Sequence, residues 1–467
     1  MACPGHRVWG ANDDIRVAVI GLGGKGSQHA EVFRKLPGAR VVALGDPDPQ
    51  RLAKCREPFD KEGLKVVEAT DPRRLLDRPD VDAVVIATPN HWHALLAVWA
   101  CQAGKDVYVE KPVSHNLWEG RQIVNAARKH GRIVQAGTQY RSDPGLREAV
   151  EYLRGQPLGK ALWGHVLWYE YRESIGRAEP YIPKDIDYDL WCGPAPLEPL
   201  RRPRLHYDWH WVWSTGDGDL GNSGIHAFDL CRWLMGYPGL PPRALGLGGR
   251  FVFDDAGETP NTQLTVLDYR PAPILIENRN LPMEKGANFM DILRGIREGI
   301  IVQYEHGYFA GLRSGGAVFD NDGKRLRQFQ GDNGGQHTAN FIAAVKARKP
   351  DQLNAPVVEG HLSSAGCHLG NLSYRLGKGQ PLASVRSALT SIPVATETLE
   401  RIEKHLLTNG VHLENTPTAL GGWLQLDPDR EQIVAVEGVA RENALRACLK
   451  SPEPRKLTTF LPTTVQM

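Results

Sequence analysis

A glycine-rich turn between a predicted strand and a predicted helix is the feature that most restricts how this chain can fold. Residues 15–23 read IRVAVIGLG, a helical stretch follows to Leu36, and a second apolar run, ARVVALGD, occupies 39–46. Apolar runs of this kind suit strands that crossover helices bury on both faces. The pattern therefore predicts a βαβ unit within a parallel sheet.

The same rhythm of strand and helix continues along the first third of the chain. Further apolar runs occupy 82–89, 106–112 and 132–140, and helical stretches separate them. Repeated βα units at this spacing predict a doubly wound parallel sheet of the Rossmann type, which ends near residue 140. We place this α/β domain at 12–140.

Beyond residue 140 the pattern changes. Strands such as 164–174 and 261–269 alternate in character, and Pro-rich loops join them. This pattern predicts an α+β domain over 141–390, with a large open, mostly antiparallel sheet. Residues 391–467 carry helical stretches but no motif, and we leave the role of this C-terminal extension open.

Charge and apolar patterning exclude several classes of partner. The 56 basic and 54 acidic residues nearly cancel, which argues against a nucleic-acid ligand. No apolar run approaches the roughly 18 residues that a membrane span needs. The N-terminus lacks a signal-type apolar core, so we expect a cytoplasmic protein as the sequence stands, or a periplasmic one if an export leader has been removed. The seven scattered cysteines suggest neither a zinc site nor a disulfide framework.

The glycine turn carries the spacing of a dinucleotide site. Gly21, Gly23 and Gly26 would permit the tight turn, the close approach of backbone to a pyrophosphate, and the packing of helix on strand. Asp46 ends the second predicted strand 20 residues after Gly26, where a carboxylate can accept hydrogen bonds from a ribose diol. An acidic residue there would repel a 2′-phosphate, so NAD is favoured over NADP.

Polar residues that follow later strands extend the predicted cofactor site along the same sheet edge. Asn90 and His93 open a helix after the third apolar run, where Asn90 could equally act as a helix cap. The sequence HWH has no recognisable partner ligands, so we predict no metal. The complete set of predicted cofactor contacts is Gly21, Leu22, Gly23, Gly24, Lys25, Gly26, Asp46, Thr88, Pro89, Asn90, His93, Glu110, Lys111 and Gln139.

Six motifs in order give the chain a family resemblance. IRVAVIGLGGKG, ALGDPDP, ATPNHWH, EKP, QAGTQYRS and GNSGIHAFD, between about residues 14 and 380, resemble those of the Gfo/Idh/MocA-type oxidoreductases. The resemblance implies an N-terminal Rossmann domain and a C-terminal α/β domain whose open sheet commonly mediates assembly. It therefore implies a homo-oligomer, dimer or tetramer, formed through that sheet.

Oxidation of a secondary alcohol needs a base for the hydroxyl proton and a cation near the developing alkoxide. Lys111 ends a parallel strand, at the edge where the nicotinamide should lie. The resemblance implies that the lysine of EKP contacts both cofactor and substrate hydroxyl. We therefore assign Lys111 to catalysis.

The GNSGIHAFD helix supplies the other predicted catalytic residues. Asn222, His226 and Asp229 follow one another at i, i+4 and i+7 and so share one helical face. The family pattern has an aspartate where this chain has Asn222. An amide can orient a sugar hydroxyl but cannot share a proton, so His226 or Lys111 would carry more of the acid–base work.

Aromatic and cationic residues near the domain junction suggest a carbohydrate site. Trp209, Trp211 and Trp213 alternate before the catalytic helix, and aromatic faces stack on sugar C–H surfaces or simply fill a core. Arg141 could bind a hydroxyl pair or form an interdomain salt bridge. His210 is a further candidate for the cleft. The predicted substrate contacts are Tyr140, Arg141, His165, Trp209, Asn222, His226 and His337.

A helical stretch after residue 356 has two stripes. One is apolar, and the other is polar, of a kind typical of a surface or an interface. The polar stripe consists of His361, Ser364, His368 and Arg375.

These features lead to three functional hypotheses. The first is an NAD-dependent oxidoreductase acting on a secondary hydroxyl of a sugar, glycoside or polyol, with C3 of a sugar favoured because a ketone there acidifies the neighbouring C–H. The second is a glycosidase with tightly bound NAD, which acts by transient oxidation, elimination, hydration and re-reduction. The third is a non-catalytic, cofactor-binding regulator.

Overall fold

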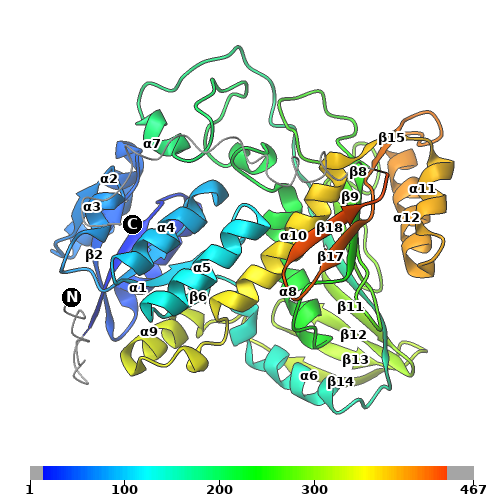
Figure 1. Cartoon of the computed structure of the whole chain (residues 1–467), viewed down its shortest axis with the longest axis horizontal. Helices are drawn as coiled ribbons and strands as arrows, with labels where there is room; N and C mark the ends of the chain where they lie inside the picture. Colours follow the sequence, from blue (N-terminus) through cyan, green and yellow to red (C-terminus); the bar gives the residue numbers. More distant parts are fainter. Residues whose placement is uncertain (1–13, 439–467) are drawn as a thin grey trace.

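Six parallel strands form the first sheet, in the order β3-β2-β1-β4-β5-β6. The computed structural model describes residues 14–438, and Figure 1 shows this sheet beside a second, larger one. The predicted doubly wound sheet is confirmed. Its strands are β1 (Ile15–Ile20), β2 (Ala39–Gly45), β3 (Val67–Ala69), β4 (Ala83–Ile86), β5 (Asp106–Val109) and β6 (Val134–Ala136).

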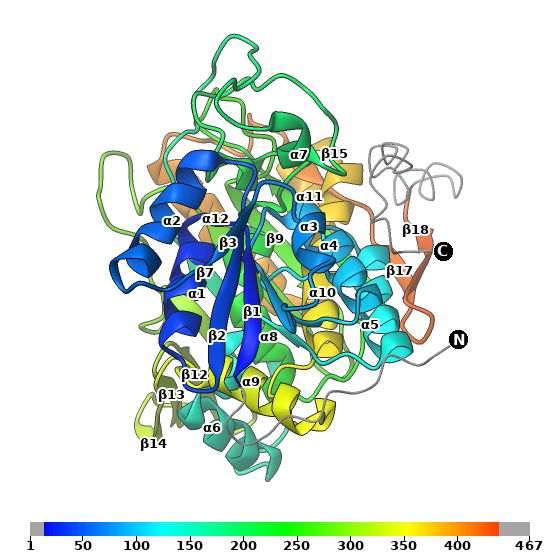
Figure 2. The ribbon, with the colours of Figure 1, turned by 90° about the vertical axis from the view of Figure 1, so that its left-hand side faces the viewer.

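Helices cover both faces of this sheet (Figure 2). Val17 and Val19 of β1 pack with Phe33 of α1, whereas Ala18 and Ile20 belong to the core formed by α4 and α5 on the other face. This division follows from the alternation of side chains along a strand. The helices are α1 (Gly24–Lys35), α2 (Pro49–Lys61), α3 (Arg73–Leu76), α4 (Asn90–Gln102) and α5 (Leu117–His130), joined on the α1 face by α9 (His337–Ala347) from late in the chain.

The second sheet is mixed but mostly antiparallel, as predicted. Its main path runs β14-β13-β12-β11-β7-β10-β9-β8-β16-β15, with β17 paired to β8 and β18 to β17, and β7–β10 is its parallel pair. The strands are β7 (Ala161–Tyr169), β8 (Arg243–Gly249), β9 (Thr262–Leu267), β10 (Ile274–Arg279), β11 (Glu298–Tyr304), β12 (Gly307–Leu312), β13 (Gly315–Phe319), β14 (Arg325–Gln330), β15 (Lys378–Gln380), β16 (Thr418–Leu420), β17 (Leu424–Asp427) and β18 (Gln432–Val436).

Three helices fill the inner face of the second sheet, toward the first domain. They are α6 (Pro144–Arg154), α8 (Ile225–Leu234) and α10 (Val357–Leu376). The backbone N–H of Val113 donates to Ser364 Oγ on α10 at 3.0 Å, and His361 on the same helix is fully buried. His361, Ser364 and His368 of the polar stripe therefore lie at the interface between the two domains, whereas Arg375 is exposed.

The outer face of the second sheet is covered by later parts of the same chain. Helices α11 (Leu382–Leu389) and α12 (Pro393–Thr408) pack on β8, β9 and β10, with Leu399 and Ile402 against Val266 and Leu275. Met290, from the loop after β10, packs on β7 and β11. The C-terminal extension thus supplies α12 and β16–β18, while its residues beyond 438 lie outside the described part. Much of the sheet face that was expected to mediate assembly, over β7–β11, is therefore covered by the same chain.

A buried ionic cluster lies beneath this cover, centred on Glu277 of β10. Glu277 accepts hydrogen bonds from Arg279 at 2.7 Å, from His165 at 2.9 Å and from the Tyr169 hydroxyl at 2.8 Å. Arg401 of α12 approaches the same carboxylate at 3.3 Å. His165 is only 1% exposed, on the face of the sheet away from the first domain, so its predicted substrate contact is wrong.

A long segment, residues 170–216, connects β7 to the start of the helix that carries Asn222 and His226, and it crosses back over the first domain; we call it the strap. It forms the loops at the top of Figure 1 and contains α7 (Tyr188–Cys192) and the short helix η2 (Asp208–Trp211). Hydrogen bonds join the strap to the first domain. The N–H of Asp187 donates to the Pro47 carbonyl at 3.2 Å. The indole of Trp92 in turn donates to the Trp191 carbonyl at 3.1 Å.

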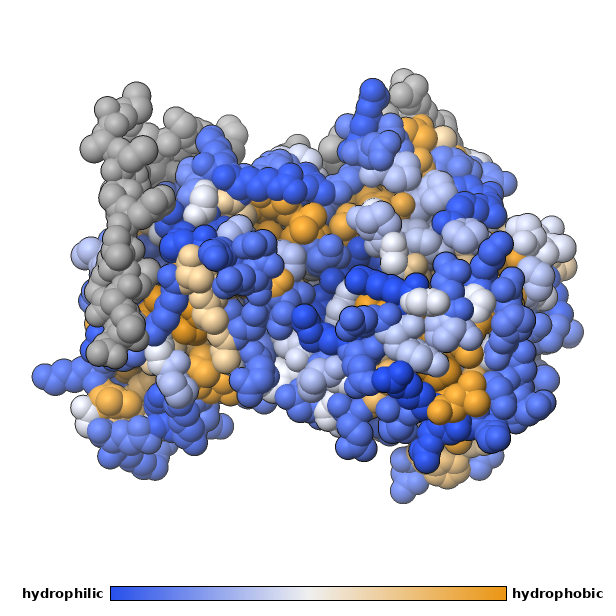
Figure 3. All heavy atoms as spheres, turned by 90° about the horizontal axis from the view of Figure 1, so that it is seen from below, coloured by the Kyte–Doolittle hydropathy of each residue, from blue (hydrophilic) through white to orange (hydrophobic). Residues whose placement is uncertain are grey.

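The surface seen from below is mostly hydrophilic, and apolar atoms gather only in small separate areas (Figure 3). Within residues 14–438, no helix is long and apolar enough to cross a membrane.

Candidate functional site

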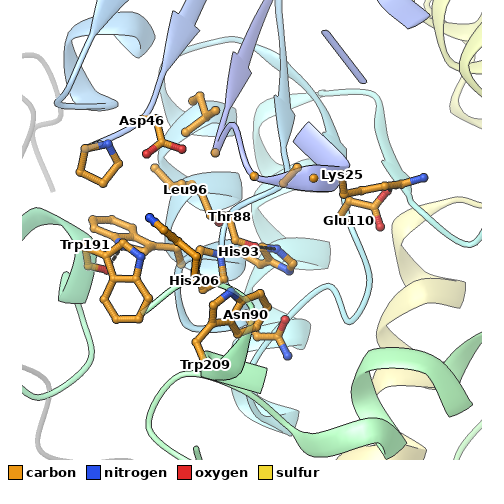
Figure 4. A pocket seen from close by; sticks show the side chains of 18 of the residues that line it. Lys25, Asp46, Thr88, Asn90, His93, Leu96, Glu110, Trp191, His206 and Trp209 are labelled. Atoms are coloured by element: carbon orange, nitrogen blue, oxygen red, sulfur yellow. Dashed lines mark hydrogen bonds and ion pairs between the residues drawn. The ribbon is translucent and has the colours of Figure 1, made fainter. Parts of the chain in front are cut away.

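A pocket of about 380 Å³ lies between the carboxyl ends of the parallel strands and the strap. Figure 4 shows Asp46, Thr88 and Asn90 on its sheet side, facing Trp191, His206 and Trp209 of the strap. This position matches the rule that ligands of open α/β sheets bind beyond the carboxyl ends of the strands. Predicted residues that line the pocket are Gly21, Gly23, Gly24, Lys25, Asp46, Thr88, Pro89, Asn90, His93, Glu110, Lys111, Trp209, Asn222 and His226.

The glycine turn is built so that only glycine fits at two of its positions. Gly21 has φ +84°, and a Cβ there would lie 2.6 Å from the backbone nitrogen of Thr88. A Cβ on Gly26 would lie 1.6 Å from the carbonyl oxygen of Gly21. Gly24, by contrast, begins α1 with open space around its Cβ position. The free N–H groups of this helix start are therefore available to an anionic group in the pocket.

Asp46 fixes the glycine turn from the end of β2. Its carboxylate accepts the N–H of Leu22 at 2.6 Å and the N–H of Asp48 at 2.9 Å. Burial raises the pKa of Asp46, and the two N–H donors oppose this shift. Each carboxylate oxygen retains acceptor capacity toward a hydroxyl group in the pocket.

Two polar residues after β4 tie the pocket to the second domain and to the β5 turn. Asn90 starts α4, and its amide donates to Asp217 at 2.8 Å, so it does not cap the helix as the alternative interpretation held. His93 lies between the carbonyls of Thr88 at 2.8 Å and Pro112 at 2.6 Å. Both residues line the pocket, but these bonds give them a structural role as well.

Glu110 anchors the turn that presents Lys111. It is 4% exposed and accepts a hydrogen bond from His29 of α1 at 2.7 Å. Burial acts to raise the pKa of Glu110, but Lys25, His29 and Lys111 together bring it below its ordinary value. A charged Glu110 therefore holds the Lys111 turn against the first helix of the glycine motif.

Lys111 reaches from the end of β5 to the second domain. Its Nζ donates to the backbone carbonyl of Asn222 at 2.5 Å and lies 3.5 Å from Asn222 Oδ1. Burial lowers the pKa of Lys111, and the neighbouring Glu110 carboxylate opposes that shift. Lys111 and Asn222, two of the three predicted catalytic residues, are thus in direct contact.

Asn222 and His226 enter the pocket from an irregular helix start. Residues Leu220–Gly224 form a π-helical turn, η3, which leads directly into α8. Burial lowers the pKa of His226 well below its ordinary value, so its imidazole is neutral. Its Nδ1 atom is buried without a hydrogen-bond partner among the described residues. The irregular turn is a common feature of functional sites.

Three other residues predicted to contact substrate do not line the pocket. Arg141 pairs with Asp229 at 2.8 Å and 2.9 Å, and because both residues lie in the 141–390 domain, this salt bridge is within that domain rather than between domains. His337 bonds Ser142 at 2.6 Å and the Ala136 carbonyl at 2.9 Å, away from the pocket. Tyr140 does not line the pocket, although its ring lies edge-on to His226 at 5.4 Å.

Three predicted cofactor contacts do not line the pocket. Gln139 begins the short helix η1 (Gln139–Ser142), and Leu22 and Gly26 lie within the glycine turn itself. Leu22 contributes its N–H to Asp46, and Gly26 contributes close packing. These two residues therefore shape the turn rather than face the pocket.

Four strap residues line the pocket without having been predicted. His206 contacts Asp48 at 2.9 Å, beside Asp46, and Trp191 lies near it (Figure 4). His210 stacks on the predicted Trp209, with ring centroids 3.6 Å apart. The aromatic cluster around 207–213 was the one local signal for this part of the site. The unpredicted residues are Leu190, Trp191, His206 and Tyr207.

Across residues 14–438, no group of three or more His, Cys, Asp or Glu side chains is arranged to hold a metal ion.

Both halves of the fold match one protein family. Residues 15–138 match the family described as oxidoreductase family, NAD-binding Rossmann fold, and residues 164–259 match its C-terminal alpha/beta domain. The chain belongs to the Gfo/Idh/MocA oxidoreductase family.

Several curated proteins and solved structures are similar to the chain. Inositol 2-dehydrogenase 4 of Saccharopolyspora erythraea is 37% identical over 157 residues, covering 33% of this chain and 45% of that protein. The scyllo-inositol 2-dehydrogenase (NAD(+)) of Bacillus subtilis is 32% identical over 150 residues, covering 32% and 43%. The matches thus span about half the length of these relatives. A levoglucosan dehydrogenase in complex with NADH and L-sorbose shares the fold, with a TM-score of 0.58, 18% identity, and coverage of 77% of this chain and 96% of that one.

Proposed function

We propose that the protein is an NAD-dependent dehydrogenase that oxidises a secondary hydroxyl group of a polyol or sugar. The observation that carries this proposal is the contact of Lys111 with Asn222, beside His226, in the pocket that the glycine turn and Asp46 also line. A cofactor end and a proton-transfer end therefore share one cavity. The names of the similar curated proteins, which are inositol dehydrogenases, support the substrate class.

The residues present fit a dinucleotide. Gly24 leaves open space at the start of α1, and Thr88 Oγ1 and His226 Nδ1 are pocket atoms without partners in the described chain. Asp46 can hold a ribose diol, and the N–H groups of α1 can hold the pyrophosphate. When bound, the nicotinamide would accept the hydride from the carbon that carries the reacting hydroxyl.

Lys111 takes the hydroxyl proton in this proposal. Because burial lowers its pKa, a larger fraction of its amine is neutral and able to accept a proton at working pH. The two oxygens of Asn222 then stabilise the ammonium that forms. His226, which is neutral, orients the substrate oxygen from α8 by a hydrogen bond.

The aromatic side chains at the pocket suit a carbohydrate. Tyr207 is 51% exposed, and Trp209 lies beside it with its ring stacked on His210. Such rings bind the C–H faces of sugars and cyclic polyols, while hydroxyl groups bond the polar edge of the site. This arrangement favours a neutral, ring-shaped substrate.

A panel of inositols, free sugars and glycosides, each incubated with the protein and NAD, tests the proposal. We expect absorbance at 340 nm to rise for one class of substrate, and mass spectrometry to find a product two mass units lighter. Cleavage of a glycoside without NADH accumulation would instead indicate the redox-neutral glycosidase. Binding of NADH with no change in any substrate would indicate a non-catalytic protein.

The cofactor preference gives a separate prediction. Asp46→Ser removes the carboxylate that would accept the ribose diol and repel a 2′-phosphate. We expect the Kd for NADH to rise about tenfold to a hundredfold, the range for loss of a hydrogen bond to a charged group, and that for NADPH to change less. Titration of NADH and NADPH fluorescence measures both values. Asp60→Ser, an exposed change on α2, is the control. An unchanged ratio of the two Kd values would contradict an NAD preference set by Asp46.

A further inference from the structure

We propose that Asp219 is a positioning residue for the reaction, which fixes the side-chain amide of Asn222 so that its oxygen faces Lys111. This inference rests on the proposed function, because it concerns the same proton-transfer site. Asp219 directly precedes the π-helical turn η3 and lies one helical turn before Asn222. It was not among the residues that the sequence singled out.

The orientation of the Asn222 amide follows from the chemistry of its neighbour. Asn222 Nδ2 donates to Asp219 Oδ1 at 3.3 Å. A carboxylate only accepts hydrogen bonds, so the NH2 group of the amide must face Asp219. The oxygen must then face the other way, where Lys111 Nζ lies 3.5 Å from it.

Asp219 is itself held rigidly. It is 2% exposed, and Arg172 donates to its two oxygens at 3.0 Å and 3.1 Å. The Asn280 amide donates to Oδ2 at 2.6 Å. With three hydrogen bonds from two side chains fixing it, Asp219 has little freedom to rotate away from Asn222.

The arrangement leaves Lys111 one direction for substrate. When protonated, its Nζ carries three N–H groups, and the two oxygens of Asn222 occupy two of them. The third N–H, or the lone pair of the neutral amine, is then available to the pocket, where the reacting hydroxyl would lie. An Asn222 amide turned by 180° would present NH2 to Lys111 and repel its ammonium form.

The charge of Asp219 adds an electrostatic effect at Lys111. Its negative charge favours the ammonium form, whereas burial disfavours that form more strongly. The charged and titratable groups around Lys111 are Glu110, Lys25, Asp219 and Arg172, together with His210 and His226 of the pocket.

Exchanging the acid and the amide between positions 219 and 222 tests the proposal. The variants are Asp219→Asn, Asn222→Asp and the double variant that carries both changes. Glu170→Gln is the matched control, because it removes the other carboxylate bonded to Arg172, at 2.7 Å, without touching Asn222. The kcat is measured against pH with the best substrate of the panel. Trace acetylation of Lys111 by acetic anhydride, quantified by mass spectrometry across pH, reports the pKa of Lys111 without turnover.

We expect Asp219→Asn to lower kcat about tenfold to a hundredfold and to shift Lys111 acetylation to lower pH by about one unit, because a nearby negative charge is lost. Asn222→Asp should shift acetylation to higher pH, since two carboxylates then face the lysine. The double variant keeps one negative charge on the pair, so its acetylation profile should return to within about half a unit of the parent. The Glu170→Gln profile should match the parent.

Two results would overturn the proposal. One is an Asp219→Asn protein with the kcat and the Lys111 profile of the parent. The other is a double variant whose kcat is lowered by the product of the two single-variant factors, since that result excludes coupling between the two residues. If the parent oxidises no substrate, the acetylation profiles still decide the role of Asp219, while the dehydrogenase proposal itself fails. If Asp219→Asn does not fold, Asn222→Asp and the double variant carry the comparison.

Discussion

Replacing Lys111 with methionine is expected to lower kcat for hydroxyl oxidation about a thousandfold, within the range typical of a lost general base. Methionine has a similar length and fits the same buried path, but it can neither accept a proton nor hold an alkoxide. Because the glycine turn and Asp46 are unchanged, the variant should still bind NADH. Turnover is followed at 340 nm, and binding by NADH fluorescence.

The exposed Lys129 on α5 provides the control for this change. Lys129→Met removes the same charge at the protein surface and should leave kcat within a factor of two. A Lys111→Met enzyme that keeps more than a tenth of the parent kcat would show that another group takes the proton. His226 would then be the next candidate for the base.

The pH dependence of the parent should follow the same lysine. Oxidation needs the neutral amine, so kcat/KM rises with pH up to the pKa of Lys111 in the free enzyme and then levels off. Because burial lowers that pKa, the plateau should begin below the ordinary value for lysine of about 10.4. In the reverse direction the ammonium form is needed, and the rate should fall over the same interval. If the rise of kcat/KM with pH occurs over the same pH interval in the Lys111→Met variant, the titrating group is a residue other than Lys111.

Replacing Glu277 with leucine is expected to destabilise the fold by about 3–5 kcal/mol, the cost of leaving a buried charge without its partner. Glu277 and Arg279 are both fully buried, and His165 and Arg401 also face this carboxylate. Removing the acid leaves the Arg279 guanidinium with Asp291 at 2.8 Å as its remaining acidic partner. Urea unfolding followed by circular dichroism measures the loss.

An exposed pair on α6 and β14 offers the comparison for Glu277. Glu148 pairs with Arg327 at 2.5 Å, but both side chains are about half exposed. Glu148→Leu should therefore cost less than about 1 kcal/mol. Equal losses for the two variants would mean that the buried cluster contributes no more than a surface ion pair.

The first domain was predictable because its signals are local. Each buried parallel strand is a continuous apolar run, and the glycine turn and Asp46 lie within one βαβ unit. The positions of Lys111 and Asn90 follow from the rule that strand ends meet at one sheet edge. Strand β3 was missed because it has three residues, of which Val67 and Glu68 are exposed, so no periodicity marks it.

The second half of the site depends on contacts between distant segments, which no local pattern reveals. His206 of the strap reaches Asp48, 158 positions earlier in the chain. His165 was assigned to the substrate, but strand alternation places it on the outer face, where Glu277 binds it. The sequence could not decide between a substrate contact and a salt bridge for Arg141, whose partner Asp229 lies 88 positions later in the chain. In each case the residue type indicated a polar interaction, but the sequence could not identify the partner.

The α11–α12 hairpin has a consequence for how this chain can associate. It packs on the apolar outer face of the second sheet, with Val385 and Leu399 buried against strands β8–β10. A second subunit could reach the strands beneath this hairpin, β8–β10, only by displacing it. Deletion of residues 381–408 would expose the apolar side chains of β8–β10 that the hairpin covers, and we expect the shortened chain to aggregate.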